Sequence, residues 1–181
     1  MFQTEFKKGC MLVLGGAKSG KSTFALEICN QLVKRPVFLA TAQALDNEMA
    51  ERIRRHKLER GNEWVTEEEP LDVTGSIQRM DREDRVIIFD CLTLWVNNLY
   101  MEYCEDRQAI EQTMDNLVSI LKEIRGTIIL VSNEVGLGIV PDNPMARSYR
   151  DDLGVLNRRI AGLSKKVVNL VAGLPMVLKD E

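Results

Sequence analysis

The chain has 181 residues, of which 45% are hydrophobic and 28% are charged. This length can bury one sizeable core but is too short for two ordinary catalytic domains, so we expect a single domain. The formal net charge of -3 gives the molecule no overall positive field. Nucleic acid and anionic membrane surfaces are therefore disfavoured as principal partners, and a small-molecule substrate fits the composition better.

Cysteine usage and apolar patterning point to a reduced, cytoplasmic protein. The four cysteines form no CxxC pair, and only one histidine is present to join them in a metal site. Residues 1–10 contain no apolar run of signal-peptide length, and no segment is long and apolar enough to span a bilayer. We therefore expect a cytoplasmic location and no integral membrane association.

Short apolar segments alternate with longer helical patterns along the chain, as in repeated βαβ units around a mostly parallel sheet. We expect residues 1–10 to be an N-terminal extension without function and residues 11–181 to form the single domain. A final segment, residues 175–178, is predicted to return as an antiparallel edge strand at the C-terminal end of an α/β fold. The predicted parallel strands are residues 11–15, 36–41, 86–90, 127–132 and 167–171.

Two apolar stripes at helical spacing are interpreted as core packing rather than as cofactor-binding segments. The acidic run from Glu67 to Glu69, directly before Pro70, is predicted to be a loop. The first stripe ends before Gly126, which is a typical helix-terminating residue. The two stripes consist of Ile110, Met114, Leu117, Val118, Leu121 and Ile124, and of Tyr149, Leu153, Leu156, Ile160 and Leu163.

The strongest motif lies between the first strand and the first helix, where residues 15–22 read GGAKSGKS and match GxxxxGK[ST]. In such a P-loop, backbone N–H groups and the following helix dipole surround the phosphates of a nucleotide. Lys21 is expected to reach the β and γ phosphates, and Ser22 to ligate Mg2+. A chance glycine-rich turn is the alternative, which the flanking strand and helix disfavour. The predicted phosphate site comprises Gly15, Gly16, Ala17, Lys18, Ser19, Gly20, Lys21 and Ser22.

The third predicted strand ends in a carboxylate, because the apolar run Val86 to Phe89 is followed by Asp90. A Walker B strand has this form, and its aspartate holds Mg2+ directly or through water. An aspartate at this position can instead cap the next helix. The strand alone therefore supports the P-loop prediction only weakly.

The chain's one histidine lies in a basic helix predicted to run from Asp46, as the N-cap, to Arg60. Arg52, His56 and Arg60 are spaced four apart and share one face with apolar residues, so His56 should look toward the protein body or a cleft. The histidine could be a hydrogen-bonded packing residue, or a nucleophile that attacks phosphorus beside neutralising arginines. Spacing alone does not decide between these two interpretations.

Several segments together resemble one family, the bifunctional adenosylcobinamide kinases and adenosylcobinamide-phosphate guanylyltransferases of cobalamin biosynthesis. The resemblance extends over nearly the whole chain from Met11 onward, and NEVGLGIVP is far more distinctive than the P-loop. The matching segments are GGAKSGKS at 15–22, ATAQALDNEMAERIRRHK at 40–57, WVTEEEPL at 64–71, FDCLTLWVNNL at 89–99 and SNEVGLGIVPDNPMARSYRDDLGVLNRRIA at 132–161.

The resemblance implies two reactions. Such proteins phosphorylate a hydroxyl of adenosylcobinamide with ATP or GTP, and then use GTP to form adenosyl-GDP-cobinamide and pyrophosphate. The second reaction is described as passing through a guanylylated histidine, which favours the nucleophile interpretation of His56. Two alternatives remain from the residues themselves: a simple P-loop kinase of a small molecule, and a nucleotide-dependent switch or binding module.

The resemblance also implies further nucleotide contacts and a homotrimer, and the position of one acid at the sheet edge adds a separate candidate. Glu134, just beyond the fourth predicted strand, is a candidate to help activate the acceptor hydroxyl, because open α/β sheets bind ligands at this edge. Instead of contacting the nucleotide, Thr41 could simply be the last residue of its strand, and Glu68 could be a solvent-exposed acid. Besides Asp90, the implied nucleotide contacts are Thr41, Ala42, Gln43, Lys57, Leu58, Glu59, Arg60 and Glu68.

Overall fold

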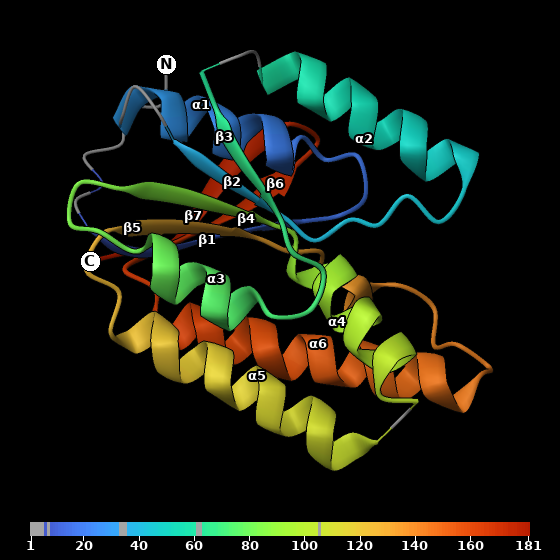
Figure 1. Ribbon diagram of the computed structural model, residues 1–181. Helices are drawn as coiled ribbons and strands as arrows, with labels where there is room; N and C mark the ends of the chain where they lie inside the picture. Colours follow the sequence, from blue (N-terminus) through green and yellow to red (C-terminus); the bar gives the residue numbers. More distant parts are fainter. Residues whose placement is uncertain (1–5, 7, 33–35, 61–62, 105) are drawn as a thin grey trace.

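The computed structural model describes residue 6 and residues 8–32, 36–60, 63–104 and 106–181. A seven-stranded sheet in the order β3-β2-β4-β5-β1-β6-β7 forms its centre, with helices on both faces (Figure 1). The elements are β1 (Gly9–Gly15), α1 (Lys21–Leu32), β2 (Val37–Ala40), α2 (Asn47–Arg60), β3 (Val65–Glu68), α3 (Val73–Met80), β4 (Val86–Asp90), α4 (Leu92–Glu102), α5 (Arg107–Lys122), β5 (Thr127–Val131), η1 (Val135–Leu137), α6 (Pro144–Leu163), β6 (Lys166–Val171) and β7 (Leu174–Asp180).

The predicted mostly parallel sheet with an antiparallel final strand is confirmed. Strands β1 to β6 pair in parallel, and β7 returns antiparallel along β6. The central strands alternate between two cores: Leu12 and Leu130 face the side covered by α3, α4, α5 and α6, whereas Val13 and Ile129 face α1. Because both faces are covered, these strands are apolar throughout.

The prediction that residues 67–69 form a loop is wrong for Glu67 and Glu68, whereas Glu69 does lie in the loop that follows the strand. Val65–Glu68 is strand β3, which pairs in parallel with Val37–Ala40 at the edge of the sheet. The strand is short and largely exposed, so it carries charged side chains where a buried strand would carry apolar ones. Its pairing with β2, rather than any local apolar pattern, makes it a strand.

The other differences concern element ends. The sheet begins at Gly9, whose N–H donates to the Gly126 carbonyl at 2.8 Å, and the buried ring of Phe6 packs in the core beneath α1. The described part of the predicted 1–10 extension therefore contributes to the sheet and the core; residues 1–5 and 7 lie outside the described residues. Strand β7 is also longer than predicted, at Leu174–Asp180.

The predicted helical stripes do pack in the core. Ile110, Met114, Leu117, Val118 and Leu121 are buried on α5, as are Leu153, Leu156 and Ile160 on α6. None of the helices in the described segments combines the length and apolar character that a membrane span requires.

Asp81 joins the turns that precede β4 and β5. One carboxylate oxygen accepts from the N–H of Gly126 at 2.9 Å, and the other accepts from the N–H of Arg125 at 3.0 Å and from its guanidinium at 3.2 Å. Burial penalises the charged carboxylate, but these hydrogen bonds outweigh that penalty, so the pKa of Asp81 lies below its usual value. The carboxylate thus fixes the start of the central strand β5.

We expect Asp81→Ala to lower the free energy of unfolding by about 1–3 kcal/mol at pH 7, because the buried N–H of Gly126 and the partly buried N–H of Arg125 lose their acceptor. Asp84→Ala, which removes an exposed carboxylate nearby, should change stability by less than about 0.5 kcal/mol. Since the folded pKa of Asp81 lies below the unfolded value of about 3.9, its contribution is complete above that pH and is lost as the pH falls further. Urea denaturation measures both effects, and equal losses in the two variants would contradict this role.

Candidate active site

The P-loop lies at the carboxyl edge of the sheet, between the last residue of β1 and the first turn of α1. Gly15 has a φ of +149°, and a Cβ there would lie 2.6 Å from both the Leu170 carbonyl oxygen and the Ser19 hydroxyl. The loop is therefore pressed against β6 with no room for a side chain. Gly20 also has a positive φ, of +93°, where the chain turns into α1.

Lys21 is buried, and its ammonium donates to the Gly16 carbonyl at 2.6 Å. The positive charge is thus held against the main chain of the loop rather than extended into solvent. The Ser19 carbonyl accepts from the N–H of Gly173 at 3.2 Å, which joins the loop to the β6–β7 turn. The buried hydroxyl of Ser19 has no hydrogen-bond partner within the described residues.

Two carboxylates end neighbouring strands at the same edge. Asp90 ends β4, and Glu134 follows β5, which lies between β4 and β1. The N–H of Glu134 donates to the Gly15 carbonyl at 3.3 Å, so this residue lies beside the P-loop. Cys91, rather than Asp90, occupies the N-cap of α4, so the capping alternative for Asp90 is not what the structure shows.

A cavity of about 460 Å³ opens between α2, the ends of β2 and β3, and the junction of β4 with α4. Its apolar walls include Phe38, Met49, Ile53 and Leu94. The prediction that His56 faces a cleft is confirmed, as is the Asp46 cap, whose carboxylate accepts from the N–H of Met49 at 2.7 Å. The predicted site residues that line the cavity are Ala42, Gln43, His56, Lys57, Arg60, Glu68 and Asp90.

Other predicted site residues lie outside the lining of this cavity. The P-loop residues and Glu134 lie along the same sheet edge, on the β1 side. Leu58 is exposed on α2, and the side chain of Glu59 lies outside the described part of the chain. Thr41 is buried: its hydroxyl accepts from the N–H of Cys91 and donates to the Cys91 carbonyl, both at 3.0 Å. Thr41 therefore braces the β4–α4 junction behind the cavity.

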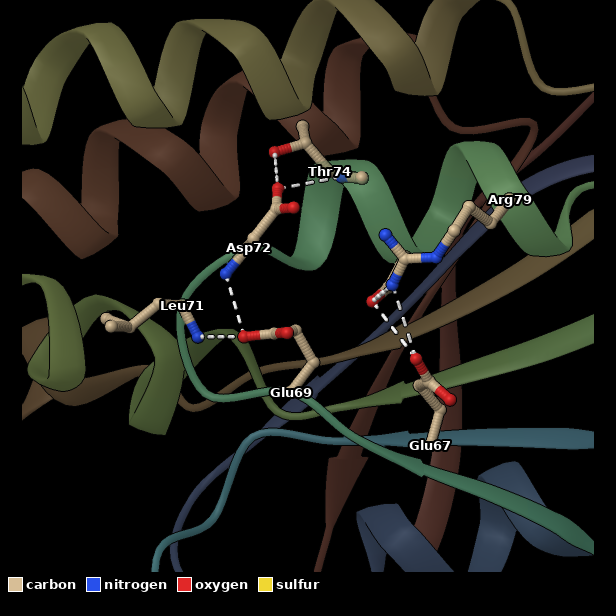
Figure 2. Close-up of polar contacts among 8 residues, drawn as sticks. Glu67, Glu69, Leu71, Asp72, Thr74 and Arg79 are labelled. Atoms are coloured by element: carbon tan, nitrogen blue, oxygen red, sulfur yellow. Dashed lines mark hydrogen bonds and ion pairs between the residues drawn. The ribbon is translucent and has the colours of Figure 1, made fainter.

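Of the three acids in the run 67–69, the outer two hold α3 in place (Figure 2). Glu67 accepts from the guanidinium of Arg79 at 3.3 Å, across to the helix. Glu69 lines the cavity, but one of its oxygens accepts from the N–H groups of Leu71 and Asp72, both at 2.9 Å. The carboxylates of Glu67 and Glu69 thus have structural partners in the segment that leads into α3.

Glu68, between them, projects from β3 toward the cavity and forms an ion pair with Lys57 of α2. Lys57 follows His56 in the chain, so the pair lies beside the imidazole. Two residues that the sequence suggested separately as nucleotide contacts are therefore joined across the cavity in this structure. Sequence spacing gave no signal for the pair, because eleven positions and a strand boundary separate its members.

An aromatic contact anchors the end of α2. The guanidinium carbon of Arg60 lies 3.7 Å from the centre of the Phe38 ring, which also makes an edge contact with Trp64. Such a cation–π contact contributes about 2 kcal/mol when it is desolvated, and Arg60 is buried. Because His56 lies one turn before Arg60, this contact holds the imidazole over the cavity.

Helix α4 supplies site residues that the sequence analysis missed. The buried amide of Asn98 donates to the Thr41 carbonyl at 2.8 Å and to the Pro70 carbonyl at 3.0 Å, joining the segments that follow β2 and β3. Burial raises the pKa of Cys91, in the cavity wall, to about 12, so its thiol remains protonated at neutral pH. The available signal was the segment FDCLTLWVNNL, in which both residues occur.

Solved structures with a similar fold include a KaiC-like protein of Pyrococcus horikoshii, with a TM-score of 0.53 and 16% identity over 96% of this chain and 79% of that one. A RadB recombinase matches with a TM-score of 0.51 and 15% identity, over 89% and 73% of the two chains. At these identities the likeness concerns the fold alone.

Other proteins are much more similar to this chain in sequence than these solved structures are. A bifunctional adenosylcobalamin biosynthesis protein CobP of Pseudomonas aeruginosa is 43% identical, over 94% of this chain and 97% of that protein. A bifunctional adenosylcobalamin biosynthesis protein CobU of Salmonella typhimurium is 34% identical, over 93% and 99%. The family model described as cobinamide kinase / cobinamide phosphate guanyltransferase matches residues 11–178, and this chain belongs to that family.

Proposed function

We propose that this protein phosphorylates the hydroxyl of adenosylcobinamide with ATP or GTP, and then transfers GMP from GTP onto the phosphorylated product. Family membership supports the reaction class. The observation that carries the proposal for this chain is a single cavity lined by His56, Lys57, Glu68 and Asp90, at the same sheet edge as the P-loop. One phosphate-binding loop can then serve two attacks on different phosphorus atoms.

In the kinase reaction, the P-loop amides and Lys21 hold the β and γ phosphates while the acceptor hydroxyl attacks the γ-phosphorus. Glu134, beside Gly15, is placed to accept the hydroxyl proton. Oxygen donors suit Mg2+, and Ser22 on α1 and Asp90 on β4 are such donors from two elements that pack together. Bound Mg2+ would offset phosphate charge at this position.

In the transfer reaction, the P-loop holds the β and γ phosphates as the leaving pyrophosphate. An imidazole nitrogen of His56 attacks the α-phosphorus, forming a P–N bond as the P–O bond to pyrophosphate breaks. A phosphate oxygen of the cobinamide phosphate then attacks the same phosphorus, and the P–N bond breaks to restore the imidazole. The protonated thiol of Cys91 in the cavity wall is a poor competitor for the nucleophilic role.

Glu68 is the acid that we assign to the guanosine nucleotide. Glu67 and Glu69 have partners around α3, whereas Glu68 pairs with Lys57 at the cavity. A carboxylate can accept hydrogen bonds only, and the N1–H and amino groups of guanine are donors side by side. Adenine lacks the N1–H donor, so this contact would favour GTP in the transfer reaction. We also propose that the working form is a homotrimer, as the family resemblance implies.

GTP labelled at the α-phosphorus tests the covalent step. We expect the wild-type protein to retain a label that survives base and is lost in acid, as a phosphoramidate does, and His56→Ala to retain none. The variant should still phosphorylate adenosylcobinamide, because the kinase reaction does not use the imidazole.

Arg54→Ala is the matched control, since Arg54 lies on the same helix but pairs with Glu51 in an exposed ion pair. It should label like the wild type. A label that persists in His56→Ala would assign the nucleophile to another residue. An unlabelled wild type with kinase activity would instead favour a simple kinase.

Gly15→Ala tests the phosphate loop. The methyl group would overlap the Leu170 carbonyl and the Ser19 hydroxyl, so the loop must shift. Backbone strain of this kind costs about 1–3 kcal/mol, and we therefore expect at least a roughly tenfold loss of affinity for GTP with Mg2+ in isothermal titration calorimetry. Gly162→Ala, where a Cβ meets no atom within 4 Å, should bind GTP normally. Unchanged affinity in Gly15→Ala would place the nucleotide elsewhere.

A further inference from the structure

A second cavity, of about 400 Å³, lies between the loop that follows β5 and the outer face of α6. We call it the α6 hollow. Gly136, Gly138 and Val140 of that loop form one wall, and the exposed side of the helix forms the other. The residues that line it include Gly136, Gly138, Val140, Arg150, Gly154 and Arg158.

Two glycines that line the α6 hollow are required neither by packing nor by turn geometry. A Cβ added at Gly136 or at Gly154 would meet no atom of the described residues within 4 Å, and neither residue has a positive φ. Gly154 lies within the 20-residue helix α6, where glycine is less favourable than alanine. A residue that lowers stability without serving packing or turn geometry suggests that something outside the chain approaches the main chain here.

Apolar side chains of the same loop face solvent, and Val140 among them lines the hollow. Leu137 is 84% exposed, Ile139 95% and Val140 58%, on a loop whose neighbouring strand is fully buried. A cluster of exposed apolar residues of this kind marks a surface that another molecule covers. Arg158 is also exposed there, and its guanidinium has no ion pair or hydrogen bond within the described residues. The hollow thus combines apolar contact area with an unused hydrogen-bond donor.

The hollow adjoins the phosphate site through one buried side chain. The amide of Asn157 donates to the Asn133 carbonyl at 3.1 Å and to the Glu134 carboxylate at 3.4 Å, while Glu134 bonds in turn to Gly15 of the P-loop. Asn157 directly precedes Arg158 on α6. The helix that lines the hollow is therefore joined through Asn157 to Glu134, which borders the P-loop.

We propose that the α6 hollow and its apolar loop bind the corrinoid ring of the acceptor substrate. This inference rests on the proposed function. A corrinoid is a broad, partly apolar macrocycle whose edge carries amide groups, so the glycines admit the ring and the exposed apolar side chains cover it. Arg158 donates to the amide carbonyl oxygens at the ring edge. The hydroxyl-bearing arm then extends past Glu134 to the γ-phosphorus at the P-loop.

Gly154→Leu tests this site, because leucine favours the helix and fills the hollow. We expect the KM for adenosylcobinamide in the kinase reaction to rise at least tenfold, with the KM for ATP unchanged within about twofold. Arg158→Ala, a surface change that leaves the fold intact, should weaken adenosylcobinamide binding about tenfold, as expected for one lost charge-assisted hydrogen bond. Gly162→Leu, the same change in open space at the end of α6, should leave both KM values unchanged.

Two further readouts separate the possible failures. Labelling of His56 by GTP requires no corrinoid, so it should stay normal in Gly154→Leu and Arg158→Ala. If wild type binds adenosylcobinamide in equilibrium dialysis and both variants bind it equally well, the ring lies elsewhere and this inference is overturned while the proposed function stands. If Gly154→Leu changes only the molar mass in light scattering, the hollow is an interface between copies of this chain. A wild type that binds no adenosylcobinamide overturns both proposals.

Discussion

The close packing of Gly15 against β6 is the constraint on which the site depends. The Leu170 carbonyl oxygen and the Ser19 hydroxyl lie only 2.6 Å from where a Cβ would be, so only glycine lets the main chain pass from β1 into the turn before α1 in this way. Such a turn directs successive N–H groups toward one point, which is the property that binds phosphate. The same residue accepts the hydrogen bond from Glu134, so the loop also fixes where the chain after β5 begins.

Two cavities lie at different places near this sheet edge, and the P-loop follows β1, the strand next to β5. The cavity with His56 is built over β2, β3 and β4, whereas the α6 hollow lies beside the loop that follows β5. In the proposed transfer reaction the α-phosphorus of the nucleotide is attacked, and in the proposed kinase reaction the γ-phosphorus is attacked. An imidazole approaching from the α2 side and an alcohol approaching from the α6 side would meet these demands without moving the phosphates far.

The sequence predicted the parts of the fold whose signals are local. Continuous apolar runs such as residues 86–89 predicted the central strands, and the P-loop motif was recognisable because a strand and a helix flank it. Strand β3 was missed because it is a short edge strand with exposed acids, held by pairing with β2. The role of Thr41 could not be predicted from the sequence either, because Cys91, to which its hydroxyl is hydrogen-bonded, is 50 positions away.

In the candidate site, too, some features could be predicted from local sequence and others depend on the tertiary fold. Helical spacing predicted that His56 faces a cleft, and the cavity confirms it, but spacing could not say what the imidazole does there. The resemblance to a known family supplied that hypothesis, and the geometry adds reasons for it. Contacts that join separate elements, such as the ion pair of Lys57 with Glu68 and the bonds from Asn98, depend on the tertiary fold and carry no local pattern.

The central claim is that one phosphate loop serves both reactions, and Lys21→Ala tests it most directly. The variant removes a buried ammonium that contacts the loop itself, so its folding is first verified by circular dichroism. Kinase activity with adenosylcobinamide and covalent labelling by GTP are then measured on the same preparation. The account predicts that both are lost together, because both place their phosphates on the same loop. Full retention of either activity would contradict it.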